Sequence, residues 1–209
     1  MSDEIVLYTN PMSRGRVARW MLEEVGAPYR AEILDYATTM KAPAYLAINP
    51  MGKVPAITHN GKVVTENAAI CVYLAEAFPD AGLAPKPSER ADFYRWMFFA
   101  AGPFEYAVTN NAFGMTPPAD RAAAIGYGNL KSALDTLEYA VTRMPFIAGA
   151  RFTAADLYVG SHLGFGMQFG TVEKRPAFQA YYAKIADRPA AKRAAQLDDA
   201  LMPKQAAGA

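Results

Sequence analysis

The strongest local signal in the sequence is the dipeptide Asn60-Gly61, which separates two short β-prone runs, 56–59 and 62–65. Asparagine and glycine tolerate the positive φ angles of a type I′ turn, and this turn matches the twist of two antiparallel strands. The pattern therefore predicts a β-hairpin with a two-residue loop. One antiparallel strand pair is thus expected in the first part of the chain.

The residues before the hairpin indicate a strand, a helix and a second strand. Residues 4–9 are β-prone, apolar residues recur at helical spacing over 17–25, and residues 29–34 alternate as a strand. Gly26 and Pro28 end the helix. Two strands joined by a helix form a parallel pair, so this part is predicted to be a βαβ unit.

A helix is also predicted after the hairpin. An irregular stretch through Leu46 leads to the hairpin, and residues 67–78 then continue as a helix that Pro79 ends. The predicted order of elements is βαβ followed by ββα. Residues 1–79 are therefore expected to form an α/β domain.

The second half of the chain is predicted to be helical. The proline-containing segment 80–88 is interpreted as a linker, because the β-prone alternation disappears beyond it. Apolar residues then recur at helical spacing in five segments, at about 88–112, 118–143, 154–168, 176–187 and 189–201. Residues 89–209 are therefore expected to form an all-helical bundle domain.

Charge and composition exclude several kinds of partner and site. Lysine and arginine number 21 against 20 aspartate and glutamate, so the chain lacks the positive excess that attracts nucleic acid or anionic lipid. No basic segment precedes an apolar run at the N-terminus, and no run approaches the roughly 18–20 apolar residues that span a membrane. A cytoplasmic protein is therefore expected. One cysteine, Cys71, and two histidines, His59 and His162, give no basis for a disulfide or a metal site.

Pro55 follows Val54 at the head of the hairpin. Proline has no N–H to give to a strand ladder, so Val54 can present its own N–H and C=O to an outside peptide, above all if the Val54-Pro55 bond is cis. An ordinary proline at the start of a strand is the alternative. The local pattern leaves both interpretations open.

Glu66 and Asn67 stand between the hairpin and the next helix. Backbone N–H groups are unpaired at a helix start, so a carboxylate and an amide there can hold an α-amino acid end, which carries one charge of each sign. Asn67 as a simple N-cap, with Glu66 as a first-turn charge, is the other interpretation.

Ser13 lies at the start of the first predicted helix. A hydroxyl in this position is first of all a helix cap, although it can also donate a hydrogen bond to a substrate thiolate. No histidine lies nearby in sequence, so a Ser-His-Asp nucleophile has no support. If Ser13 acts chemically, it acts as a donor.

Five residues in the helical half fall on one helix face at spacings of four and three: Phe99, Pro103, Tyr106, Asn110 and Phe113. Such a stripe usually belongs to the core. Gly102-Pro103 predicts a kink, however, and a kinked helix can also form the wall of an apolar ligand site.

The segment Thr153-Ala154-Ala155-Asp156 fits an N-capping box with aspartate as its acid. We interpret this motif as a folding signal rather than a site. Cys71 is interpreted as a small buried apolar residue, and His59 as a solvated residue at the hairpin tip.

The order and spacing of these features across nearly the whole chain resemble the cytosolic glutathione transferase family. The resemblance rests on Leu7-Tyr8 to Arg19-Trp20, Asn49-Pro50-Met51-Gly52-Lys53-Val54-Pro55-Ala56, Thr65-Glu66-Asn67-Ala68-Ala69-Ile70, and Phe146-Ile147-Ala148-Gly149 followed by Thr153-Ala154-Ala155-Asp156. It implies a thioredoxin-like N-terminal domain, a helical C-terminal domain and a homodimer. The lack of a tyrosine at the usual place resembles the serine-type bacterial members, theta-like or beta-like.

The resemblance also implies how glutathione would be held. Val54 would pair its backbone with the cysteinyl unit, next to a cis Pro55. Glu66 and Asn67 would hold the γ-glutamyl end, with Asn67 standing where relatives usually have serine. Lys53 would reach a glutathione carboxylate, while Gly52 leaves out a side chain that some relatives use.

A catalytic hydroxyl and a second substrate site are implied in the same way. Ser13 is the only hydroxyl between Asn10 and Trp20, so it becomes the donor to the thiolate. Asn10 is assigned to the glutathione site, and Asn10 and Tyr8 are reserves for the catalytic role. A small hydrophobic electrophile would contact four apolar side chains: Met12, Tyr106, Phe113 and Met115.

The resulting hypothesis is a glutathione transferase that joins the glutathione thiolate to a hydrophobic electrophile, with glutathione as co-substrate and no metal. Two alternatives share the fold. One is glutathione-dependent reduction of disulfides or peroxides, and the other is a non-catalytic module for glutathione binding or protein interaction. Oxidised glutathione as product would favour the first alternative, and a lack of glutathione binding would favour a scaffold.

Overall fold

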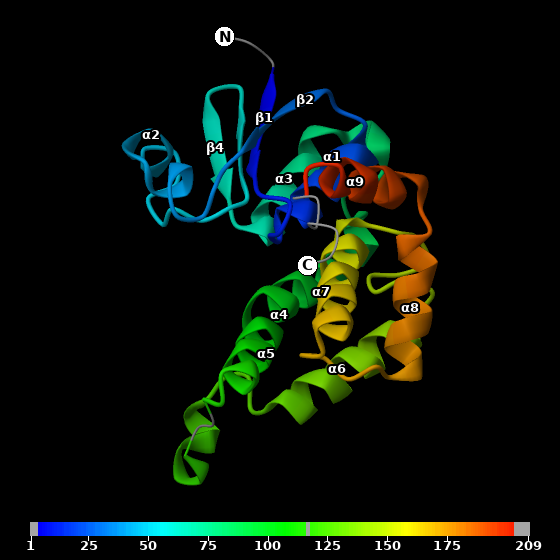
Figure 1. The fold of residues 1–209 in the computed structure, drawn as a ribbon. Helices are drawn as coiled ribbons and strands as arrows, with labels where there is room; N and C mark the ends of the chain where they lie inside the picture. Colours follow the sequence, from blue (N-terminus) through cyan, green and yellow to red (C-terminus); the bar gives the residue numbers. More distant parts are fainter. Residues whose placement is uncertain (1–3, 116–117, 203–209) are drawn as a thin grey trace, which may run out of the picture. The chain divides into compact units, whose positions relative to one another are not determined.

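A computed structural model describes residues 4–115 and 118–202 of the chain (Figure 1). These residues form two compact units. Unit 1 consists of residues 4–82 and 187–202, and unit 2 is Leu83–Ala186. Within the described ranges, no helix is both long and apolar enough to cross a membrane.

Unit 1 is built on a four-stranded mixed sheet with the strand order β2-β1-β3-β4. Strands β1 (Ile5–Thr9) and β2 (Tyr29–Ile33) are parallel, whereas β3 (Ala56–His59) is antiparallel to β1 and to β4 (Lys62–Thr65). Asn60 and Gly61 have φ angles of 51° and 70°. These values confirm the predicted hairpin turn, and the sheet has the expected thioredoxin-like order.

Three longer helices accompany this sheet: α1 (Gly15–Val25), α3 (Asn67–Ala77) and α9 (Pro189–Asp199). Helix α1 packs against α3 and α9 (Figure 1). Gly26 ends α1 in the left-handed conformation, as the sequence predicted. The stretch expected to be irregular contains the short helices η1 (Thr39–Lys41) and α2 (Pro43–Leu46), and η2 (Pro79–Ala81) follows α3.

Helix α9 belongs to unit 1 because acidic and basic side chains fix it to α1. Arg19 Nε donates to Asp198 Oδ1 at 2.8 Å, and both side chains are buried. Arg188, immediately before α9, forms a two-pronged ion pair with Glu24 at 2.7 Å. The compact units therefore differ from the predicted domains in the place of α9, since helical periodicity does not reveal what a helix packs against.

Unit 2 is helical, with a core of aromatic and aliphatic side chains that includes Phe93, Trp96 and Phe178. Its helices are η3 (Pro87–Glu89), α4 (Arg90–Phe99), η4 (Ala100–Phe104), α5 (Glu105–Ala112), η5 (Ala119–Ala124), α6 (Leu130–Arg143), α7 (Ala154–Phe169) and α8 (Pro176–Ala186). Helix α7 is buried along most of its length and packs against α4 and α8.

The Gly102-Pro103 pair lies in η4, a π-helical turn that joins α4 to α5. Proline lacks the N–H of a regular helical hydrogen bond, and a π turn is one way to accommodate it. The turn also shifts the helical phase. Tyr106 and Phe113 are 62% and 75% exposed, so the core interpretation of the apolar stripe is wrong for these two residues.

The prediction of a single helix over 118–143 is also wrong. Helix α6 starts only at Leu130, after the short η5 and a break that contains Gly126 and Gly128. Gly128 has a φ angle of 66°, and Asn129 caps α6 by accepting a hydrogen bond from Ser132 N at 2.9 Å. The prediction followed the apolar spacing alone, and it therefore ignored the glycines and the Asn129 cap that determine where α6 begins.

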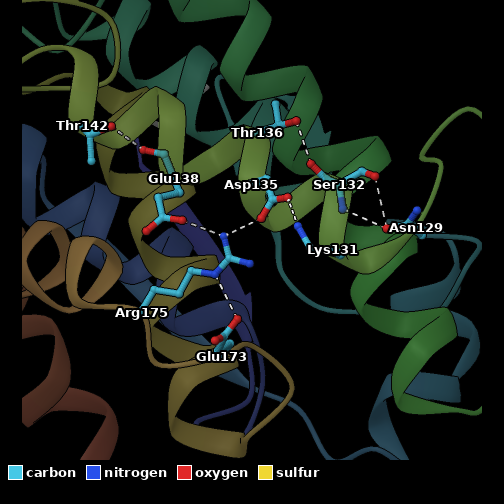
Figure 2. Close-up of polar contacts among 9 residues, drawn as sticks. All are labelled: Asn129, Lys131, Ser132, Asp135, Thr136, Glu138, Thr142, Glu173 and Arg175. Carbon is cyan, nitrogen blue, oxygen red and sulfur yellow. Dashed lines mark hydrogen bonds and ion pairs between the residues drawn. The ribbon is translucent and has the colours of Figure 1, made fainter.

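Arg175, the residue before α8, connects α8 to α6 through carboxylates (Figure 2). Its Nη1 atom lies 2.8 Å from Asp135 Oδ1 and 2.7 Å from Glu138 Oε2, and its Nε lies 3.0 Å from Glu173 Oε2. The Arg175 side chain is largely buried, so its charge is matched inside unit 2 rather than presented to a ligand.

Candidate active site

Ser13 lies in the turn Asn10–Arg14, between β1 and α1. Its Oγ donates to Asn10 O at 2.7 Å and accepts from Gly15 N, the first helical amide, at 2.9 Å. The hydroxyl thus engages the helix start, although the N-cap residue itself is Arg14. For Ser13 to donate to a thiolate, its proton must turn away from Asn10 O.

Asn10 is buried, and both ends of its amide are occupied. Nδ2 donates to Leu34 O at 2.8 Å, and Oδ1 accepts from Met12 N at 2.9 Å. Asn10 therefore shapes the turn. Tyr8 packs against Tyr45, with ring centroids 5.6 Å apart. The Asn10 amide is thus committed to the turn, which favours Ser13 over Asn10 as the group that can change its hydrogen-bond partner.

The Val54-Pro55 bond is cis, as the resemblance implied. No hydrogen bond to another described residue uses the N–H or C=O of Val54. The preceding residue is held by the chain itself, since Lys53 O accepts from Tyr45 OH at 2.5 Å and from Asn49 Nδ2 at 2.8 Å. Val54 therefore offers a fixed backbone donor and acceptor.

Lys41 is a second cation beside this loop, and the sequence analysis missed it. Its Nζ donates to Gly52 O at 2.7 Å, whereas the Lys53 side chain is exposed. Gly52 has a φ angle of 57°, and a Cβ there would lie 2.9 Å from Lys41 Nζ. No local pattern could have found Lys41, because it reaches the loop from the short helix η1.

Glu66 and Asn67 form the start of α3. Glu66 has φ 64° and ψ 117°, an unusual conformation for a residue with a side chain, and is exposed. Asn67 Nδ2 donates to Arg14 O at 2.9 Å, while Asn67 Oδ1 is buried with no partner within the described ranges. This hydrogen bond joins residues that are 53 positions apart in the sequence. The start of α3 thus contacts the turn that contains Ser13.

The residues expected to contact an electrophile are exposed. Met12 is 65% exposed in unit 1, and the three unit 2 residues, Tyr106, Phe113 and Met115, are at least half exposed. The structure describes them only within their own units. Their role stays a prediction.

Cys71 is completely buried, as expected, and burial raises the pKa of its thiol to about 12. His59 is not simply solvated, because it is half-buried. Its Nδ1 lies 2.8 Å from Tyr73 OH, and its ring stacks on Phe78. Neither residue belongs to the turn, loop and helix start described above.

Comparisons with known proteins identify the relatives of this chain. The family model described as the glutathione S-transferase N-terminal domain matches residues 12–77. Glutathione S-transferase 3 of Zea mays is 30% identical over 202 residues, which cover 88% of this chain and 90% of the maize protein. Glutathione S-transferase 3 of Schizosaccharomyces pombe is 29% identical and covers 92% of this chain and 87% of its own length.

Solved structures give the same result. A sphingomonad glutathione S-transferase complexed with glutathione is 31% identical with a TM-score of 0.75, and the match covers 93% of this chain and 98% of that chain. A theta class glutathione S-transferase from Xanthomonas axonopodis pv. citri with glutathione bound is 28% identical, with a TM-score of 0.71 and the same two shares covered. The chain therefore belongs to the glutathione S-transferase family of enzymes.

Proposed function

We propose that the protein joins the thiolate of glutathione to a small hydrophobic electrophile. The observation that carries this proposal is the hydrogen bond of 2.9 Å from Asn67 Nδ2 to Arg14 O. It brings together the two segments to which the resemblance assigned thiol activation and γ-glutamyl binding. The Val54 backbone, which has no partner among the described residues, adds a third element, suited to the cysteinyl unit of a peptide.

Glutathione would be bound by complementary charges and backbone groups of unit 1. The Val54 N–H and C=O would pair with the cysteinyl unit. Glu66 and the first amides of α3 would hold the γ-glutamyl ammonium and carboxylate, with Asn67 beside them. Lys53, together with Lys41, would attract the glycyl carboxylate.

Ser13 would then stabilise the thiolate. A free thiol with a pKa near 8.5 is only a few per cent ionised at neutral pH, and lowering the pKa by about two units takes about 2.7 kcal/mol. A helix N-terminus contributes about 0.3–1 kcal/mol, whereas a hydrogen bond to a charged acceptor contributes about 1.5–3 kcal/mol. The hydroxyl is therefore the larger source of stabilisation.

The thiolate would attack the electrophile and form a thioether, with Met12, Tyr106, Phe113 and Met115 as the apolar contacts. The same proposal includes a serine-type bacterial class, theta-like or beta-like, a homodimeric assembly and a cytoplasmic location. The Xanthomonas relative, a theta class enzyme, supports a theta-like class.

Replacement of Ser13 tests this function. Ser13→Ala should lower turnover about 10- to 100-fold and leave glutathione affinity nearly unchanged, because only the thiolate loses a donor. Ser132→Ala, which removes a hydroxyl from the start of α6, is the matched control and should keep full turnover. Equal turnover in both variants would remove Ser13 from the mechanism.

Product analysis in the same assay separates the alternatives. A thioether supports conjugation, whereas oxidised glutathione would favour disulfide or peroxide reduction. Such a reductase would have no protein thiol to use, since the one cysteine of the sequence, Cys71, is buried and its pKa is raised to about 12. A protein that binds no glutathione would be a scaffold.

A further inference from the structure

The peptide group between Pro11 and Met12 is fixed at both of its polar atoms by side chains. Met12 N donates to Asn10 Oδ1 at 2.9 Å, and Pro11 O accepts from Arg16 Nε at 2.6 Å. This peptide plane immediately precedes the Met12-Ser13 peptide. The orientation of the Pro11-Met12 peptide therefore determines the position of the Ser13 hydroxyl.

Arg16 is the one charged donor among these contacts, and its position is set from the far end of the chain. Its Nη2 lies 2.7 Å from Oδ1 of Asp199, the last residue of α9. Asp198 beside it is anchored to α1 by the buried ion pair with Arg19. The guanidinium of Arg16 thus bridges the α9 end and the carbonyl of Pro11.

A planar guanidinium held at two nitrogens has little freedom to rotate. Its stem is restrained as well, since Arg16 is half-buried on the second residue of α1. If Arg16 served only to join α1 to α9, its Nε would not need to donate to Pro11 O in the turn Asn10–Arg14. Arg193 illustrates this, because it pairs with Glu23 of α1 at 3.2 Å and, in the described structure, forms no hydrogen bond or ion pair with residues 10–14.

We propose that Arg16 is a positioning residue for thiolate activation: it holds the Pro11-Met12 peptide, and with it the Ser13 hydroxyl, in a place that the α9 carboxylate Asp199 helps to define. This inference rests on the proposed function. Arg16 touches no reacting atom and acts through the backbone of the turn.

The test compares Arg16→Met, Asp199→Asn and the control Arg193→Gln. Ultraviolet absorbance of the thiolate in the binary complex, measured against pH, gives the pKa of bound glutathione without any electrophile. Arg16→Met should raise this pKa by about one unit and lower kcat about 10- to 100-fold, while KM for glutathione changes less than about threefold. Arg193→Gln should leave the thiol pKa unchanged.

Asp199→Asn should move the thiol pKa in the same direction but with a smaller effect, about two- to fivefold in kcat, because the pair is partly exposed. This variant keeps the test decisive if Arg16→Met fails to fold. An unchanged thiol pKa in both Arg16→Met and Asp199→Asn would overturn the inference and leave the proposed function standing. Absence of glutathione binding by the wild-type protein would overturn both.

Discussion

Tyr181 donates a hydrogen bond of 2.6 Å to Oδ1 of Asp156, and both side chains are buried in unit 2. Oδ1 also accepts from Ile147 N at 2.7 Å, while Oδ2 accepts from Thr153 N and Thr153 Oγ1 at 2.8 and 2.9 Å. Burial raises the pKa of this carboxyl, and the four donors oppose that rise. The predicted capping box is confirmed, and Asp156 also joins α7 to α8 and to the loop before it.

Removal of the Asp156 carboxylate should strongly destabilise unit 2. Asp156→Ala would leave the buried amides of Ile147 and Thr153 without an acceptor, at a cost of about 1–3 kcal/mol each. Tyr181→Phe removes one donor to a charged group and should cost about 1.5–3 kcal/mol. Urea unfolding followed by the fluorescence of buried Trp96 measures both. Equal midpoints for Asp156→Ala and wild type would contradict the folding role.

A side chain at Gly15 should destabilise the protein while Thr9 is present. A Cβ at Gly15 would lie 2.0 Å from Oγ1 of the fully buried Thr9. Gly15→Ala should therefore cost about 1–3 kcal/mol through overpacking. The double variant Gly15→Ala/Thr9→Ala removes the clash with Thr9 Oγ1 but keeps the approach of 2.9 Å to Ser13 Oγ, so it should recover part of this loss in thermal unfolding. Simple additivity of the two single effects would show that the clash is not the cause.

Replacement of Glu66 by glycine should raise the stability of the protein and weaken glutathione binding, because Glu66 has a strained backbone and a carboxylate. Glycine adopts a positive φ without penalty, so Glu66→Gly should stabilise the protein by about 1 kcal/mol and still weaken glutathione binding about tenfold, because the carboxylate is lost. Asn60→Gly, at the other non-glycine residue with a positive φ in the described ranges, is the matched control. It should leave glutathione binding unchanged. Calorimetry and thermal unfolding measure the two effects, and equal glutathione affinity in both variants would remove Glu66 from the site.

The ion pair between Glu89 and Arg151 should make unit 2 sensitive to acid. Arg151 Nη2 lies 2.5 Å from Glu89 Oε2, and Nε lies 3.0 Å from Oε1. Burial alone would raise the pKa of Glu89, but the Arg151 guanidinium and the Lys86 N–H outweigh it and hold the pKa below its ordinary value of 4.5. The folded protein thus binds this proton less tightly than the unfolded chain.

A depressed pKa stabilises the fold above pH 4.5, and this contribution is lost as pH falls through the lower, folded-state value. Arg151→Gln should therefore be less stable at neutral pH but lose less further stability on acidification than wild type. Arg121→Gln, which breaks the exposed pair with Asp120, should behave like wild type. Parallel pH profiles for Arg151→Gln and wild type would exclude this ion pair as the cause.

Local signals in the sequence predicted the elements that depend on local chemistry. Asn60-Gly61 gave the hairpin because its turn needs two positive φ angles, and Thr153 with Asp156 gave the start of α7 because both ends of the capping box lie within four residues. The prediction of one helix over 118–143 was wrong because Gly126, Gly128 and the Asn129 cap interrupt the helix despite the apolar spacing.

The long-range contacts of the site could not be derived from local patterns. Arg16 reaches Asp199 across 183 residues, and Asn67 reaches Arg14 across 53. Lys41 was missed because its contact with Gly52 O depends on the path of the loop that contains Gly52. The resemblance supplied the cis Val54-Pro55 bond, which spacing alone had left open.

We propose that unit 1 both binds glutathione and ionises its thiol. Calorimetric titration with glutathione in two buffers of different ionisation heat measures the affinity and the protons released together. We expect micromolar to low millimolar binding with substantial proton release near neutral pH. Binding without proton release would contradict thiolate activation, and no binding would contradict the assignment of Val54, Glu66 and Asn67 to a glutathione site.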